Sequence, residues 1–259
     1  MTQPAHKNIV LLHPSYQIRA QGDRCLSIDF GDSISAETGR ICLSAAASFR
    51  HAALAGVIDI TPSFNSVALH YLPFAHPASS GPTDPQTFEV ISFESLSRKV
   101  SALIDAGLPE IGQLARTVEI PVCYGGEYGP DLSFVASQTG LTETQVIERH
   151  SNSDVMVFTL GFAPGLPYIG VHDPIFAIPR RDTPRTAVPA GSVAVANRQS
   201  TIYPNLLPGG WHILGATPLA MFAVDRAPPS RLMPGDSVKF VPITETQFDE
   251  MRKTQGLPL

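Results

Sequence analysis

The sequence contains few cysteines and few charged residues for its length. Only three cysteines occur among 259 residues, and Cys25, Cys42 and Cys123 lie far apart without Cys-x-x-Cys spacing. Such a sparse, odd set is typical of reduced, buried thiols rather than of a disulfide framework. Charged residues make up 16% of the chain and hydrophobic residues 43%, a balance that favours a globular protein with a sizeable core.

Long apolar runs and basic runs are absent as well. The apolar stretch from Ile9 to Leu12 is too short for the hydrophobic segment of a signal peptide. No window approaches the roughly 20 apolar residues of a membrane span. The formal net charge of −5 argues against a nucleic-acid-binding surface. We therefore expect a cytoplasmic protein.

Motifs of several enzyme classes are missing from the sequence. It contains no Gly-x-x-x-x-Gly-Lys phosphate loop, no Gly-x-Gly-x-x-Gly after a strand and no Gly-x-Ser-x-Gly nucleophile turn. The eight histidines never recur at i, i+3 or i+4, so local spacing indicates no zinc site. Cys123, beside a Gly-Gly pair, is the one cysteine whose setting resembles that of a nucleophile, although most lone cysteines serve core packing.

Prolines and glycines, in contrast, are plentiful and gather in four stiff connections. Glycine permits backbone angles closed to other residues, and proline fixes φ. Rigid loops on a β scaffold are a common way to build a binding site, although Pro-Gly pairs are also ordinary turn formers. Each connection lies beside a short apolar segment, and the four occupy residues 161–168, 188–192, 207–211 and 233–236.

The first half of the chain combines strand and helix patterns. Ser35 is a suitable N-cap for a helix with apolar residues at i, i+4 and i+8. Asp84 suggests the start of a long helix that is closed by Gly107, and Thr142 with Gln145 forms a capping box. Residues 1–19 are expected to be a loose leader, residues 73–86 a loop, and residues 25–30, 57–60, 66–71 and 118–122 strands.

From residue 155 onward the pattern changes to many short strands separated by turn signals. No stretch after residue 151 carries a helical stripe longer than two turns, and this texture indicates a barrel or sandwich. The sequence therefore predicts an α+β protein with an N-terminal α/β sandwich over residues 20–152 and a β domain over residues 153–245. The strands are expected at residues 155–160, 192–197, 200–203, 211–214, 219–223 and 237–241.

Most polar candidates for a site lie in the second half. Arginine presents a planar fork that suits a carboxylate or phosphate, glutamine and tyrosine hydrogen-bond amides, and adjacent glycines let a ligand approach the backbone. The same arginines could be solvated surface charge, and the aromatic residues could be barrel core. The candidates are Arg180, Arg181, Arg185, Gln199, Thr201, Tyr203, Gly209, Gly210 and Trp211.

Three residues of the first half are possible acid or base groups. Glu127 follows a Gly-Gly pair, where a side chain can project freely. Asp131 has an alternative role as a helix N-cap, and His150 has one as a cation near a helix C-terminus. We favour these structural roles for Asp131 and His150, which leaves Glu127 as the acid/base candidate.

Several segments resemble the 5-oxoprolinase B-subunit family, also known as the allophanate hydrolase subunit 1 or KipI family. The resemblance extends from about Arg24 to Ile243, and its motifs follow in the family's order. They are Ile120-Pro-Val-Cys-Tyr-Gly-Gly-Glu127, Gly129-Pro-Asp-Leu132, Gly161-Phe-Ala-Pro-Gly165 with Tyr168, Pro179-Arg180, Gly191-Ser-Val193, Thr201-Ile-Tyr-Pro204 and Pro208-Gly-Gly-Trp211.

The resemblance implies an architecture, an activity and partners. Its second domain would be a cyclophilin-like β-barrel. Members act with a 5-oxoprolinase C subunit of related barrel architecture and an A subunit of the LamB/YcsF type, and together they open 5-oxo-L-proline to L-glutamate with ATP. Related domains occur in urea- and allophanate-processing enzymes, and one member inhibits a sporulation histidine kinase. These two roles remain alternatives to the role of a 5-oxoprolinase subunit. A further alternative, a peptidyl-prolyl isomerase, rests on fold analogy alone.

The chemistry of lactam opening suggests roles for the candidate residues. A resonance-stabilised amide needs activation of its carbonyl oxygen and a site for the developing charge. We expect Glu127 and Arg185 to be catalytic, and a barrel pocket to bind substrate through Phe162, Arg180, Gln199, Tyr203, Gly209, Gly210 and Trp211. Gly125, Gly126 and Glu127 are expected at the domain junction, close to residues 161–168. ATP would be shared with the partner subunits, and no metal site is visible.

Overall fold

The structure, a computed structural model, describes residues 10–75, 89–110 and 116–254. The chain divides into two compact units, Met1–Leu114 and Ala115–Leu259. This division differs from the boundary expected at residues 152/153. Strand β9 (Thr117–Tyr124) is a member of the barrel of the second unit, because it pairs with strands from the C-terminal half. Barrel membership of this kind depends on long-range pairing that the local pattern of residues 117–124 does not express.

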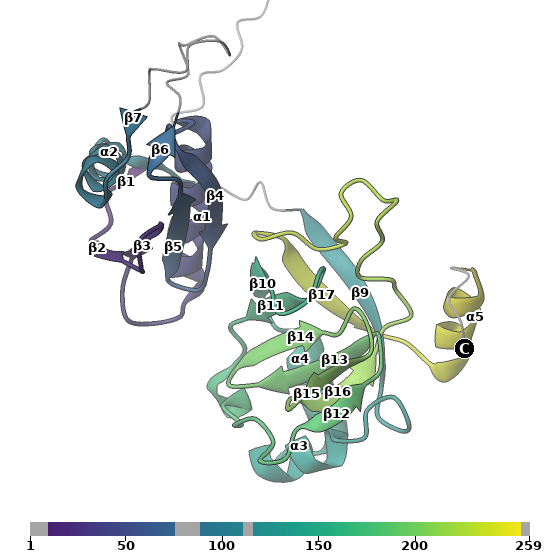
Figure 1. Ribbon diagram of the computed structural model, residues 1–259. Coiled ribbons are helices and arrows are strands. Elements are labelled where there is room, and N and C mark those ends of the chain that lie inside the picture. Colours follow the sequence, from purple (N-terminus) through teal and green to yellow (C-terminus); the bar gives the residue numbers. More distant parts are fainter. Residues whose placement is uncertain (1–9, 76–88, 111–115, 255–259) are drawn as a thin grey trace, which may run out of the picture. The chain divides into compact units, whose positions relative to one another are not determined.

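The first unit is built on a four-stranded antiparallel sheet (Figure 1). Its strand order is β2-β3-β5-β4, with Ile28 opposite Val67 in the register. Contrary to the expectation of a loose leader up to residue 19, Ile18 pairs with Ile28. The strands of this unit are β1 (Leu11–Leu12), β2 (Gln17–Ala20), β3 (Cys25–Asp29), β4 (Val57–Pro62), β5 (Ser66–Tyr71), β6 (Phe74–Ala75), β7 (Glu89–Val90) and β8 (Leu108–Pro109).

Two capped helices pack with this sheet. Helix α1 (Ala36–His51) begins at Ser35, whose side chain accepts the N–H of Thr38, as the sequence predicts. Helix α2 (Phe93–Asp105) begins at a Ser92/Ser95 capping box. The expected start at Asp84 lies outside the described residues. The predicted helix is nevertheless too long at its beginning, because Glu89–Val90 form strand β7 and the helix begins only after Ser92.

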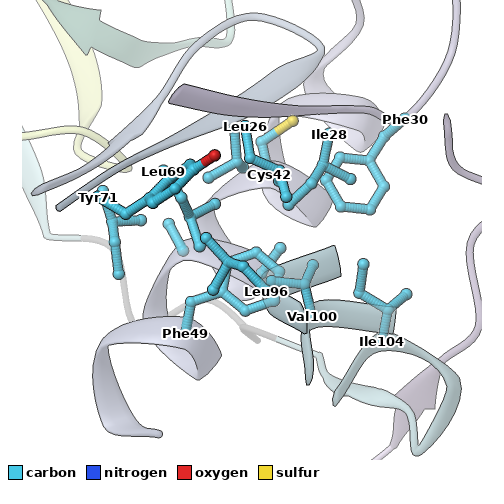
Figure 2. Packing of buried hydrophobic residues seen from close by; sticks show 14 of the residues in the cluster. Leu26, Ile28, Phe30, Cys42, Phe49, Leu69, Tyr71, Leu96, Val100 and Ile104 are labelled. Atoms are coloured by element: carbon cyan, nitrogen blue, oxygen red, sulfur yellow. The ribbon is translucent and has the colours of Figure 1, made fainter. Parts of the chain in front are cut away.

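The core of the first unit lies between the sheet and the two helices. Figure 2 shows side chains from β3, β5, α1 and α2 pointing toward one another. Burial of this apolar surface is the main driving force for folding the unit, at about 25 cal/mol per Å² removed from water. The labelled residues are Leu26, Ile28, Phe30, Cys42, Phe49, Leu69, Tyr71, Leu96, Val100 and Ile104.

The second unit is a closed β-barrel with the strand order β10-β11-β14-β13-β16-β9-β17. Only β9 and β17 run parallel among these neighbours, and Figure 1 shows them side by side. The fold is therefore the α+β protein with a β-barrel that we expected. The strands not yet bounded are β10 (Val155–Leu160), β11 (Pro167–Gly170), β13 (Ser192–Ala196), β14 (Gln199–Ile202), β16 (His212–Ala216) and β17 (Ser237–Pro242).

Shorter elements surround the barrel. A two-stranded sheet pairs β12 (Arg185–Val188) with β15 (Leu207–Gly209). The expected strand over 219–223 is instead a loop with one bridge, Phe222 to Ser230. The helical segments are α3 (Leu132–Thr139), α4 (Glu143–Ser151), η1 (Pro174–Phe176) and α5 (Glu245–Thr254).

Two of these helices compare directly with the sequence predictions. Helix α4 has the predicted Thr142/Gln145 capping box. Helix α5, with 10 residues, exceeds the two turns expected after residue 151. Its only buried residue is Phe248, so it lacks the apolar stripe that a sequence pattern requires. None of the helices in the described ranges is long and apolar enough to cross a membrane.

Candidate functional site

A pocket of about 270 Å³ opens on the second unit. Its walls come from β11, β14 and β15 and from the loops next to them. Six of the predicted substrate-binding residues line it together: Phe162, Arg180, Tyr203, Gly209, Gly210 and Trp211. Thr201, one of the polar candidates, lines the pocket as well. The further lining residues, which were not predicted to bind substrate, are Leu166, Tyr168, Pro184 and Pro208.

The only tryptophan of the chain forms one wall of the pocket. The guanidinium carbon of Arg180 lies 5.5 Å from the centroid of the Trp211 ring, in the range of a cation–π contact. Tyr168 meets the same indole edge-on, with centroids 6.1 Å apart. Arg180 is exposed, and it makes no ion pair within the described part of the chain. An anion that enters the pocket therefore meets an available guanidinium.

Tyr203 and Gly209 fit against each other inside the pocket. A Cβ atom at Gly209 would lie 2.1 Å from the Tyr203 hydroxyl oxygen, so only glycine leaves room for this phenol. Burial raises the pKa of Tyr203, opposed by the charge of Arg180 and by a hydrogen bond from the Trp211 backbone. The phenol is therefore protonated at neutral pH and can donate a hydrogen bond.

Arg185 binds a buried carboxylate rather than lining the pocket. Its guanidinium donates 2.8 Å hydrogen bonds to both oxygens of Asp131, and Arg181 donates a third at 3.0 Å. The N–H of Ile213 donates a fourth at 2.8 Å. Asp131 is 4% exposed and takes the N-cap position of α3, but its side chain makes no capping bond.

Burial and the two arginines act in opposite directions on the pKa of Asp131. Burial alone would raise the pKa of Asp131, but the hydrogen bonds from Arg185 and Ile213 and the charges of both arginines outweigh it and lower the pKa. Asp131 is thus an ionised anchor for the loop before β12. Arg185 therefore has a structural partner and does not line the pocket, and its expected catalytic role stays a prediction.

Gln199 and Glu127 also lie away from the pocket. Gln199 pairs with Gly170 and Ala196 inside the barrel ladder and does not line the cavity. Glu127 is exposed on the turn after β9. β10 runs antiparallel to β17, whereas β9 runs parallel to it. The turn after β9 and the loop after β10 therefore leave opposite ends of the barrel, and the expected proximity of Glu127 to residues 161–168 is wrong.

Cys123 is a core residue rather than a nucleophile. Its side chain is 3% exposed and packs with Phe248 of α5. Burial raises the pKa of its thiol, and the charges of Glu245, Asp249 and Glu127 raise it further. A thiol with a raised pKa forms little thiolate at neutral pH.

A buried hydrogen-bond chain crosses the interior behind β14. His150 contacts the Tyr124 hydroxyl at 2.7 Å and the Ser200 hydroxyl at 2.8 Å. His172 contacts Ser200 at 2.7 Å and Ser153 at 2.9 Å. This network corrects the expectation that His150 is a cation at the end of a helix. Its members come from distant parts of the sequence, at sites that carry no shared local pattern.

The direction of each hydrogen bond in this buried network follows from Ser153, at its end. Ser153 uses its one proton to bond the carbonyl of Arg149, so it accepts from Nδ1–H of His172. Nε2 of His172 then accepts from Ser200, which in turn accepts from Nε2–H of His150. Both histidines are neutral in this scheme. Burial lowers the pKa of both, to about 4 for His172.

A second, shallower groove adjoins the pocket. It is lined by residues 160–165 with Phe222 and Ser230, and no charged residue lines it. Phe162 borders both cavities, is 67% exposed and has a φ of 68°. A positive φ is costly for a bulky residue, so the loop holds this aromatic side chain outward against a conformational preference.

Comparison with known proteins defines the class. The carboxyltransferase domain, subdomain C and D model matches residues 16–232. The 5-oxoprolinase B subunit of Bacillus subtilis (strain 168) is 39% identical over 90% of this chain and 95% of its own length. That of Escherichia coli O157:H7 is 50% identical over 51% of this chain and 60% of its own.

Solved structures agree with this class. TTHA0988 superposes with a TM-score of 0.68 at 34% identity, over 85% of this chain and 40% of its own. The urea amidolyase of K. lactis superposes at 0.70 but is 17% identical, over 93% of this chain and 16% of its own, so that likeness shows the fold alone.

These matches define a protein of the carboxyltransferase C and D subdomain class, in which a small α+β unit precedes a closed barrel. Within that class the chain belongs to the 5-oxoprolinase B-subunit family, also called allophanate hydrolase subunit 1. No group of three or more potential metal-ligating side chains occurs in the described ranges.

Proposed function

We propose that this chain is the B subunit of an ATP-dependent 5-oxoprolinase, which opens 5-oxo-L-proline to L-glutamate together with a C subunit and an A subunit of the LamB/YcsF type. The observation that carries the proposal is the barrel pocket. It combines an available guanidinium, an indole wall and adjacent glycines in a chain of this family. The B subunit would supply the binding site for the lactam.

The pocket suits a small planar ring that bears a carboxylate. Arg180 would hold the carboxylate of 5-oxoproline, because guanidinium and carboxylate match in charge and geometry. The ring would lie against Trp211 and Tyr168, and Gly209 and Gly210 would let it approach the backbone. The volume of about 270 Å³ is below the roughly 300–1,000 Å³ typical of sites for drug-sized ligands. This size favours the lactam over a nucleotide.

The ATP step is assigned to the assembled enzyme. Phosphorylation of the lactam oxygen would turn a poor electrophile into a reactive one, and the γ-phosphate needs cradling donors. The sequence has no phosphate loop, which supports a shared or partner-borne ATP site. Exposed Phe162 and the uncharged groove beside it would suit an interface with a partner subunit.

The two alternatives lack an observation that favours them. A kinase inhibitor would bind its kinase through a surface of the barrel, and this role would not need the pocket. A urea or allophanate role rests on structural neighbours that show the fold alone. The 5-oxoprolinase role is supported by a pocket of suitable chemistry and by a relative of that name over 90% of the chain.

The proposal can be tested with Arg180→Gln in the reconstituted three-subunit enzyme. Loss of the guanidinium should raise the KM for 5-oxoproline roughly tenfold or more, since a hydrogen bond to a charged group contributes about 1.5–3 kcal/mol. Arg19→Gln is the matched control, because Arg19 is 66% exposed on the first unit and pairs only with Asp29 and Gln17 among the described residues. Equal kinetics for Arg180→Gln and the wild type would refute this placement of the substrate.

A further inference from the structure

Tyr203 is the feature of the pocket whose chemistry goes beyond substrate capture. Its side chain is 2% exposed, and its hydroxyl lies against Gly209 at a distance that excludes any side chain there. A buried hydroxyl held this closely is positioned for one particular partner, because burial of a polar group is costly without hydrogen bonds.

The hydroxyl of Tyr203 carries a proton that it can donate. Burial raises the pKa of Tyr203, so the phenol is protonated at neutral pH. Tyr203 lines the cavity beside Arg180, so a ligand in the pocket can receive the proton.

Other candidate donors are committed elsewhere. Thr201 also lines the pocket, but its hydroxyl donates to the carbonyl of Pro167 at 2.8 Å. Gln199 lies outside the pocket lining. Arg180 lines the pocket and is assigned to the substrate carboxylate. Tyr168, the other phenol of the lining, is only partly buried, whereas Tyr203 is 2% exposed. Tyr203 is therefore the more firmly held donor for a second, uncharged oxygen on the same ligand.

Resting on the proposed function, we propose that the Tyr203 hydroxyl donates a hydrogen bond to the lactam carbonyl oxygen of bound 5-oxoproline and thereby selects a lactam over a plain ring acid. Arg180 and Tyr203 then fix the two oxygen-bearing ends of the substrate. The hydrogen bond from a neutral donor to the carbonyl oxygen becomes stronger when that oxygen gains negative charge during attack on the carbonyl carbon. Tyr203 would thus be both a specificity residue and a catalytic residue.

The test uses the full chain, whose single tryptophan lies in the pocket and reports on ligands directly. Trp211 fluorescence is titrated with 5-oxo-L-proline and with cyclopentanecarboxylate, which keeps the ring size and carboxylate but lacks the lactam. Tyr203→Phe should weaken 5-oxoproline binding about 3- to 10-fold, the loss of one neutral hydrogen bond. It should leave cyclopentanecarboxylate binding unchanged, whereas Arg180→Gln should weaken both ligands.

The outcomes separate this inference from the proposed function. Equal weakening of both ligands by Tyr203→Phe, or no weakening of either, overturns the role of Tyr203 and leaves the proposed function standing. A wild-type chain that does not bind 5-oxoproline overturns both. If Tyr203→Phe does not fold, the infrared C=O stretch of isotope-labelled 5-oxoproline bound to the wild type decides. A shift to lower frequency on binding is expected, and an unshifted band contradicts the donor.

Discussion

At the scale of single residues, the arginines of the second unit divide between two tasks. Arg181 and Arg185 hold the buried carboxylate of Asp131, while Arg180 faces the pocket beside Trp211. Their spacing in the sequence suggests one anionic site for all of them. The partner of Arg185 lies 54 positions away, so the pairing depends on the tertiary fold and has no local signature.

The cluster around Asp131 predicts a large effect on stability. Asp131→Asn should lower the free energy of unfolding by about 3 kcal/mol, because it leaves two partly buried arginines without their counter-charge. Urea unfolding followed by Trp211 fluorescence measures this change. Glu119→Gln breaks the exposed Lys239 pair and should change stability by less than about 1 kcal/mol. Similar losses for the two variants would contradict the anchoring role.

The close fit of Gly209 to Tyr203 predicts a coupled pair of mutations. Gly209→Ala places a methyl group 2.1 Å from the phenol oxygen, and overpacking of this kind costs about 1–3 kcal/mol. The same alanine should cost less in a Tyr203→Phe background, where the hydroxyl is absent. A double-mutant cycle of unfolding free energies measures the difference, and strictly additive values would show that the contact does not restrict position 209.

At the scale of elements, β14 separates the pocket from the buried hydrogen-bond chain. Thr201 of this strand lines the cavity, while the adjacent Ser200 joins His150 and His172 on the other face. Successive side chains of a strand point to opposite faces. The same short strand therefore serves the pocket on one face and a polar core contact on the other.

The histidine chain predicts acid sensitivity of the second unit. Burial lowers the pKa of both histidines, to about 4 for His172, with the Arg198 charge adding to the effect. The unfolded chain binds protons first as the pH falls below about 6.5, so stability is complete above that pH and declines toward pH 4. Each histidine contributes a slope of at most about 1.4 kcal/mol per pH unit.

Melting curves between pH 7 and pH 4, followed by Trp211 fluorescence, measure this decline. His51→Gln removes an exposed histidine of the first unit and should leave the pH dependence unchanged. Because Asp131 also has a lowered pKa, its contribution is lost at still lower pH, as the carboxylate protonates. A melting temperature that does not change from pH 6.5 to pH 4 would contradict the neutral state of His150 and His172 in the buried hydrogen-bond network.

What the sequence could and could not predict follows the range of the interactions. The Thr142/Gln145 box and the Ser35 cap are encoded within four residues and are confirmed. Six residues of the pocket lining agree with the prediction, because glycines, aromatic residues and one arginine gather on neighbouring turns of the sequence. The barrel membership of β9 and the helix α5 depend on pairing and burial between distant segments, and no periodicity revealed them.

At the scale of the whole molecule, the family and the pocket point to one part of a larger enzyme. This chain spans 95% of the 5-oxoprolinase B subunit from B. subtilis but only 40% of TTHA0988. Its pocket suits a small lactam, while its sequence has no phosphate loop. We therefore expect substrate capture and ATP chemistry to come together only when other chains are present.

This role as one part of a larger enzyme is tested most directly by an ATPase and glutamate assay with and without the partner subunits. The purified chain with ATP and 5-oxoproline should show no 5-oxoproline-dependent ATP hydrolysis. Addition of the C and A subunits should give hydrolysis together with glutamate formation, and Arg180→Gln should weaken both. Full turnover by the isolated chain would contradict this role. So would a complete mixture that does not turn over while the chain inhibits a histidine kinase, a result that would identify a regulatory protein instead.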